Sequence, residues 1–156
     1  MADRAVGNSG AISEMDVRIW LRDTDPAANL LINDFEFSPE EIRTAMTLAV
    51  DYWNDLPPYL QNAHFTVNNF PFRSAFMRGT AANLLFIAAH RFRRNALKYS
   101  VPGGAISDQE KYQEYDAAGD RVWQEYKDWV ARIKRAINVE QGWAVSWGDD
   151  MIYGRS

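Results

Sequence analysis

Few residues in this chain have the types and spacing that acid–base or metal chemistry needs. His64 and His90 are the only histidines, and there is no cysteine. Neither histidine stands in a Glu-x-x-His or His-Glu-x-x-His pattern, so a di-iron or zinc ligand set is not expected. A Walker loop, a Gly-x-Ser-x-Gly elbow and a Gly-x-Gly-x-x-Gly loop are also absent from the sequence. The adjacent acids Asp149 and Asp150 are most simply solvated surface. We therefore predict no catalytic residue, no metal site, no cofactor and no small-molecule substrate.

The strongest chemical signal is a basic cluster formed by Arg91, Arg93, Arg94 and Lys98. Guanidinium groups recognise carboxylates and phosphates. One interpretation is a solvated helix end, where cations favour the negative end of the helix dipole and bridge to acidic residues of the following helix. The other is a contact with acidic residues of a partner or with a nearby phosphate backbone. We predict that the cluster contacts a neighbouring subunit, a partner ring or DNA.

Aromatic residues form the second signal, because the chain contains six Trp, seven Tyr and eight Phe. Such residues are favoured in cores and at interfaces alike. Near the C-terminus Trp143, Val145 and Trp147 alternate as in a short strand, and Tyr153 follows. These aromatics either fold back on the core or belong to an extended tail that contacts a neighbour. We predict that Trp143, Trp147 and Tyr153 lie at a subunit interface.

The elements that must position these residues are helices. Ser38, Pro39 and Glu41 form a capping box with proline at the first helical position, and apolar residues then recur at helical spacing. Ser74 is expected to cap a second helix, rich in small and apolar residues, which we expect to be the most buried. A second capping box at Ser107 and Glu110 opens a third. The predicted helices cover residues 14–21, 38–54, 74–99 and 107–138, and residues 59–73 are predicted to be irregular.

The third long helix carries a heptad seam from Tyr115 to Ala136, and at 1.5 Å per residue it would be about 45 Å long. The VPGG turn at residues 101–104 joins it to the preceding helix in an antiparallel hairpin. Gly142 is expected to end it. The fold class predicted is all-α: a helical bundle with a long helical hairpin and extended N- and C-terminal arms.

Length and charge set further limits. With 156 residues the chain has the size of one domain, and its formal charge of −4 disfavours general affinity for nucleic acid. No apolar run reaches the length of a membrane span, so no membrane partner is predicted.

We divide the chain into a flexible N-terminal arm (1–12), a helical domain (13–142) and an extended C-terminal tail (143–156). Both ends are expected to gain order only beside neighbouring subunits.

Two stretches, FSPEEIRTAMTLAVDYWNDLPP and RRNALKYSVPGGAISDQEKYQEYDAAGDRVWQEYKDWVARIKRAIN, make the chain resemble virion structural proteins of tailed bacteriophages. The likeness is to proteins of the neck, or head-tail connector. It implies an adaptor without catalytic activity that forms a homo-oligomeric ring beneath the portal, with extended termini clasping adjacent subunits. Its partners would be the portal and the tail or neck proteins, with incidental contact to packaged DNA.

That resemblance places the chain in the virion, between capsid and tail, after assembly in the host cytoplasm. Two alternatives stay open. One is a structural protein of the tail or baseplate, since the baseplate uses proteins of similar size. The other is a non-viral helical domain that binds DNA or has a regulatory role.

Overall fold

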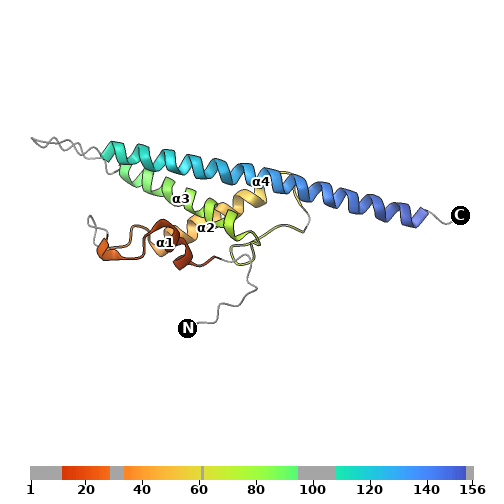
Figure 1. Ribbon diagram of the computed structural model, residues 1–156, viewed down its shortest axis with the longest axis horizontal. Coiled ribbons are helices and arrows are strands. Elements are labelled where there is room, and N and C mark those ends of the chain that lie inside the picture. Colours follow the sequence, from red (N-terminus) through yellow and green to blue (C-terminus); the bar gives the residue numbers. More distant parts are fainter. Residues whose placement is uncertain (1–11, 29–33, 61, 95–107, 154–156) are drawn as a thin grey trace, which may run out of the picture.

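The computed structural model describes residues 12–28, 34–60, 62–94 and 108–153, and within them every regular element is helical. The elements are α1 (Glu14–Leu21), a 3₁₀ turn η1 (Pro26–Ala28), α2 (Pro39–Asp55), α3 (Arg73–Arg94) and α4 (Asp108–Tyr153). Figure 1 shows α4 as a long rod with α3 alongside it; α2 packs on α3, and the short α1 contacts both α2 and α3. The predicted all-α bundle with a long α3–α4 hairpin is confirmed.

The start of α2 follows the predicted signal in atomic detail. The Ser38 hydroxyl oxygen accepts a hydrogen bond from the Glu41 backbone N–H at 3.2 Å, and Glu41 accepts one from the Ser38 N–H at 2.8 Å. Pro39 occupies the first helical turn. These bonds satisfy N–H groups that have no partner inside the helix, which fixes where α2 begins.

The loop that enters α2 is held by a buried ion pair. Arg18 on α1 donates to Asp23 at 2.8 Å, and both side chains are almost fully buried. The same Asp23 carboxylate accepts the backbone N–H groups of Glu36 and Phe37, at 2.8 and 3.2 Å. A buried carboxylate with three donors is well satisfied, and removing it would leave Arg18 and two amides short of a partner. Residues 36 and 37 are thereby placed against the bundle.

Helix α3 is the central helix, as its composition predicted. Its buried face is built largely of small residues, and one of them, Gly79, brings three helices together. An added Cβ at Gly79 would lie 2.9 Å from Ala49 Cβ on α2 and 3.0 Å from Tyr126 Cε1 on α4. Tyr126 is itself fixed there, because its hydroxyl donates to the Ala49 carbonyl oxygen at 2.6 Å. The small residue is what lets α2 and α4 approach α3 so closely.

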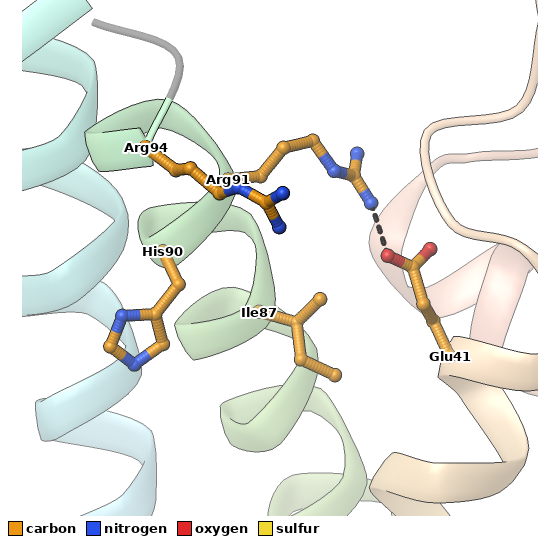
Figure 2. Close-up of a pocket in the computed structure, with 5 residues that line it drawn as sticks. All are labelled: Glu41, Ile87, His90, Arg91 and Arg94. Atoms are coloured by element: carbon orange, nitrogen blue, oxygen red, sulfur yellow. Dashed lines mark hydrogen bonds and ion pairs between the residues drawn. The ribbon is translucent and has the colours of Figure 1, made fainter.

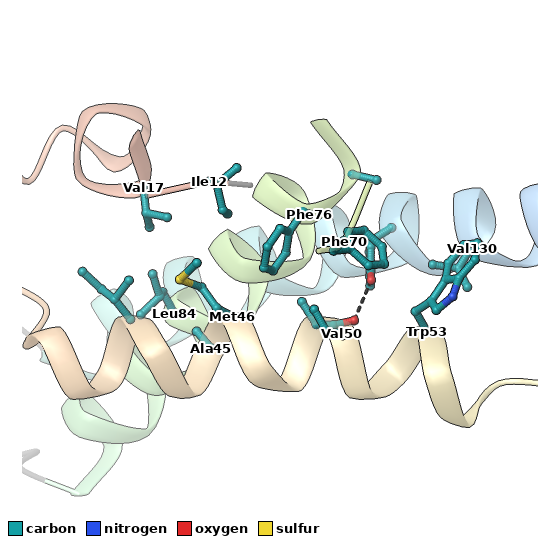
Figure 3. Packing of buried hydrophobic residues seen from close by; sticks show 14 of the residues in the cluster. Ile12, Val17, Ala45, Met46, Val50, Trp53, Phe70, Phe76, Leu84 and Val130 are labelled. Atoms are coloured by element: carbon teal, nitrogen blue, oxygen red, sulfur yellow. Dashed lines mark hydrogen bonds between the residues drawn. The ribbon is translucent and has the colours of Figure 1, made fainter. Parts of the chain in front are cut away.

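Aromatic rings fill the core at the other end of α2, which Figure 3 shows from close by. Trp53 packs against Phe70 and Phe72 with ring centroids 5.6 and 5.3 Å apart, and against Trp129 of α4 at 5.8 Å. The irregular segment predicted before α3 is confirmed, and it is tied to this cluster: the Trp53 indole N–H donates to the Ala63 carbonyl oxygen at 2.8 Å. Much of the aromatic content is therefore used inside the subunit.

Several predicted boundaries were wrong. Helix α3 begins at Arg73, one residue before the predicted cap Ser74. The Phe72 carbonyl accepts the Phe76 N–H at 2.9 Å, so the chain enters the helix where the Phe72 ring is anchored. Ile12, assigned to the arm, is 7% exposed and belongs to the core. Residues 1–11, the predicted end of α3 at 95–99, the VPGG turn and the Ser107 cap lie outside the described residues.

The largest difference concerns the C-terminal end of α4. The helix runs through Gly142 to Tyr153, so the predicted helix end, the strand-like pattern and the extended tail of residues 143–153 are corrected. A single exposed glycine costs only about 1 kcal/mol relative to alanine, and no proline or cap stands beside it to stop the helix. At 1.5 Å per residue, 46 residues make α4 about 69 Å long.

Candidate subunit interface

A shallow pocket of about 450 Å³ lies between the end of α3 and the start of α2. Its lining residues are Glu41, Ile87, His90, Arg91 and Arg94. Figure 2 shows Arg91 reaching from α3 to Glu41 on α2, with Ile87 and Arg94 pointing into the space between the two helices. Two of the residues predicted to contact a partner, Arg91 and Arg94, therefore meet in one pocket.

Arg91 is bound within its own subunit. Its Nη2 donates to Glu41 Oε1 at 2.6 Å and its Nη1 donates to the Glu36 backbone carbonyl at 2.7 Å. The acidic partner thus comes from the start of α2, about fifty residues earlier, and not from the following helix as the first interpretation supposed. About a third of the Arg91 side chain remains exposed, at 34%. Arg91 acts first as a clamp between α3 and α2.

The electrostatics of Glu41 follow from this clamp. Partial burial works to raise its pKa, but the hydrogen bond from the Ser38 amide and the hydrogen bond and charge of Arg91 outweigh burial, so the pKa lies below its usual value. The ionised form of Glu41 is favoured because it accepts hydrogen bonds from both the Ser38 amide and Arg91. On the α2 side, the pocket is therefore lined by the Glu41 carboxylate, which is already paired with Arg91.

Arg93 and Arg94 take no part in the Arg91–Glu41 ion pair. The guanidinium carbon of Arg93 lies 5.7 Å from the ring centroid of Tyr112 on α4, within the range of a cation–π contact. Arg94 and His90 are exposed, and neither has a hydrogen bond or ion pair with another described residue. Among the described residues, Arg94 is the member of the cluster best placed to take an external partner. Lys98 lies outside the described residues.

A second link ties this end of the molecule to α4. The Tyr115 hydroxyl donates to Glu36 Oε1 at 3.0 Å, and its ring stacks on Phe92 with centroids 5.2 Å apart. Burial, with the neighbouring Glu36 carboxylate, raises the pKa of Tyr115 to about 12, which keeps the hydroxyl a donor. The pocket is thus carried on a framework that α2, α3 and α4 all help to fix.

The aromatic residues predicted at an interface lie in the C-terminal part of α4, at the other end of that helix from the pocket. Trp143, Trp147 and Tyr153 fall on the helical backbone of α4, and their side chains lie outside the described part. Among the α4 side chains that the structure describes, Ile137 is the last that packs against the core cluster, and Val139 is 55% exposed. The helical backbone of α4 continues for sixteen residues past Ile137, to Tyr153.

Sequence reasoning missed two groups of residues. On α1, Met15 and Ile19 stand four apart on one face and are 59% and 60% exposed, an apolar surface that the pattern EMDVRIWL could have revealed. Inside the bundle, the Lys134 amine donates to the carbonyl oxygens of Trp53 (2.6 Å) and Leu56 at the end of α2. Lys134 follows Tyr126 of the predicted heptad seam by eight residues, a spacing that places both on the same face of α4 and could have indicated that Lys134 is buried.

Within the described ranges no three His, Asp or Glu side chains are grouped so as to hold a metal ion, and none of the helices there has the length and apolar character of a membrane span. Searches of protein-family models, of curated proteins and of solved structures found no match to this chain.

Proposed function

We propose that this chain is a structural subunit that assembles with copies of itself, and that it serves in the neck of a tailed-phage virion as a connector between portal and tail. The observation that carries the proposal is the reach of α4. Among the described side chains the core uses α4 only as far as Ile137, yet the helical backbone continues to Tyr153. A helix of that length outside its own core is stabilised by what it packs against.

The exposed apolar residues of α1 support the same proposal. Met15, Ile19 and Trp20 are 59%, 60% and 48% exposed and lie close together on an eight-residue helix. Contiguous apolar side chains on a surface indicate a contact with another protein. The chain thus offers two surfaces, on α1 and on the end of α4, to neighbours in an assembly.

The DNA-binding alternative has less support. Binding of a phosphate backbone requires unpaired cations in number, and Arg91 already uses two nitrogens on Glu41 and on the Glu36 carbonyl. The net charge of −4 also opposes approach to DNA. No described contact favours a tail or baseplate position over the neck, so these remain the alternatives within the virion.

Electron microscopy of the purified chain, with native mass spectrometry for stoichiometry, tests self-assembly. We expect closed rings. The matched control ends the chain after Val139. Because Ile137 is the last described α4 side chain in the core cluster, this variant should keep the thermal midpoint of the full chain yet fail to form rings. Cryo-electron microscopy of virions that contain the chain tests the neck position. A monomer at every concentration that also retards a DNA probe would refute the proposal and support the DNA-binding alternative.

A further inference from the structure

We propose that the pocket lined by Glu41, Ile87, His90, Arg91 and Arg94 receives the C-terminal end of α4 from a second copy of this chain. The inference rests on the self-assembly proposed above and adds which two surfaces meet. It pairs a basic, partly apolar hollow with an acidic, aromatic helix end.

The pocket has the properties of a carboxylate-binding site. Arg91 is held in place by Glu41 and by the Glu36 carbonyl, at 2.6 and 2.7 Å, so its position costs little further ordering. Arg94 adds a second guanidinium that has no partner among the described residues. With two arginines against one glutamate, the hollow keeps a net positive charge. A planar guanidinium favours a carboxylate, which it can bind through two hydrogen bonds.

Ile87 gives the same hollow an apolar wall. A ligand that matches both features carries carboxylates next to apolar side chains. A free inorganic anion would use the arginines and leave Ile87 without a contact, so a peptide segment fits better than a small anion.

The end of α4 has that composition. From Asn138 to Tyr153 the sequence contains three acidic residues, Glu140, Asp149 and Asp150, and no basic residue. Trp143, Trp147 and Met151 follow one another at intervals of four, which places them along one stripe of a continuous helix. The carboxyl end of a helix also carries partial negative charge, and this adds to that of the two aspartates.

A chain cannot fill its own pocket in this way. In Figure 1 the end of α3, where the pocket lies, is at one end of the long axis, and the C-terminal end of α4 is at the other. Because α4 is one unbroken helix, its last turns are held away from the pocket of the same subunit. The occupant must come from another copy.

Two different surfaces meet in such a contact, so it is heterologous, and repetition gives a closed ring or an open filament. A single exposed ion pair contributes only about 0 to 1 kcal/mol. The contact would gain strength from the aromatic stripe and from closure of the assembly, since each subunit is then held at two sites. Charge complementarity should also make it sensitive to salt.

Complementary charge reversal in the full-length chain tests the pairing. Arg94→Glu makes the pocket acidic, and a double variant with Asp149→Lys and Asp150→Lys makes the helix end basic. Self-association is followed by sedimentation velocity at about 0.1 M and about 1 M NaCl. Arg78→Glu is the matched control, because Arg78 is exposed, has no partner among the described residues and lies four turns away on the same helix.

We expect each reversal alone to raise the apparent dissociation constant about tenfold or more at low salt, and the control to leave it within about twofold. An equimolar mixture of the two reversed chains should associate again, since each acidic pocket then meets a basic helix end. Unchanged association of the single variants, or a mixture that fails to recover, would overturn this inference and leave self-assembly standing. A wild-type chain that stays monomeric would overturn the proposed self-assembly itself.

Discussion

The substitution Gly79→Ala measures how tightly the three long helices meet. The added methyl group would lie 2.9 Å from Ala49 Cβ and 3.0 Å from Tyr126 Cε1, where carbon atoms in favourable contact lie about 3.5 to 4.0 Å apart. Neither neighbour moves freely. Ala49 Cβ is attached directly to the α2 backbone, and the Tyr126 ring is tethered by its 2.6 Å hydrogen bond to the Ala49 carbonyl. Relief therefore requires α2 or α4 to shift away from α3.

Three contributions set the size of the effect. Alanine stabilises a helix interior by about 1 kcal/mol relative to glycine. Overpacking of a filled core destabilises by about 1 to 3 kcal/mol. Strain on the buried Tyr126 hydrogen bond removes about 1 kcal/mol more. The free energy of unfolding should fall by about 1 to 3 kcal/mol, which for a chain of this size lowers the thermal midpoint by about 3 to 10 °C.

Thermal unfolding followed by circular dichroism, with urea denaturation beside it, measures this change. Gly142→Ala is the control, because an added Cβ there has no atom within 4 Å. That variant makes the same chemical change in the extending part of α4, and it should keep the midpoint and increase the helical signal slightly. A Gly79→Ala chain as stable as wild type, or more stable, would show that the helices are not packed as closely as described.

Three further predictions concern buried and titrating groups. Lys134→Met should lower the free energy of unfolding in urea by about 1 to 3 kcal/mol, because two carbonyls at the end of α2 lose a charged donor while the apolar stem is kept; an unchanged value would contradict this. Thr80→Val should raise the thermal midpoint, because the Thr80 hydroxyl is buried without a described partner; a lower midpoint would indicate a hidden one. The pKa of Asp16 is lowered by the Ser13 amide and by Arg73, and that of Glu41 by the bonds described above. Both carboxylates therefore stabilise the fold above their unfolded pKa of about 4, and this contribution is lost as pH falls through the folded values. The midpoint should decline from about pH 5 downward, less steeply in an Asp16→Asn, Glu41→Gln variant.

Local signals predicted much of this fold. The capping box at Ser38 and Glu41 fixed the start of α2 because donor and acceptor stand three residues apart and need no other part of the chain. The run of small residues around Gly79 predicted the most buried helix, because small side chains at helical spacing have little other use. In both cases the physics is contained within one or two turns of helix.

Local signals could not predict which residues the basic cluster contacts. Arg91 bonds to Glu41 across a separation of fifty residues, and nothing local to HRFRR indicates which carboxylate a guanidinium will meet. The prediction that α4 ends at Gly142 failed for another reason. Glycine is a weak helix breaker. The spacing of Trp143, Val145 and Trp147 also fits a helix, in which residues four apart share a face and the residue between them lies on another. All the interface predictions stay predictions: those for Arg91, Arg93, Arg94, Lys98, Trp143, Trp147 and Tyr153.

Two cations, Arg91 and Lys134, contact opposite ends of α2. At its start, Arg91 of α3 bonds to the Glu36 carbonyl and to Glu41. At its end, Lys134 of α4 bonds to the last carbonyls, where the helix dipole favours a positive charge. Burial of the Lys134 amine lowers its pKa, and the nearby charge of Asp55 acts in the opposite direction. The carbonyl oxygens of Trp53 and Leu56 supply the hydrogen bonds of the buried amine. Through these contacts α2 is bonded to α3 at its start and to α4 at its end. In the proposed ring, α4 beyond Ile137, where no described side chain belongs to the core cluster, is the part of the subunit left to contact a neighbour.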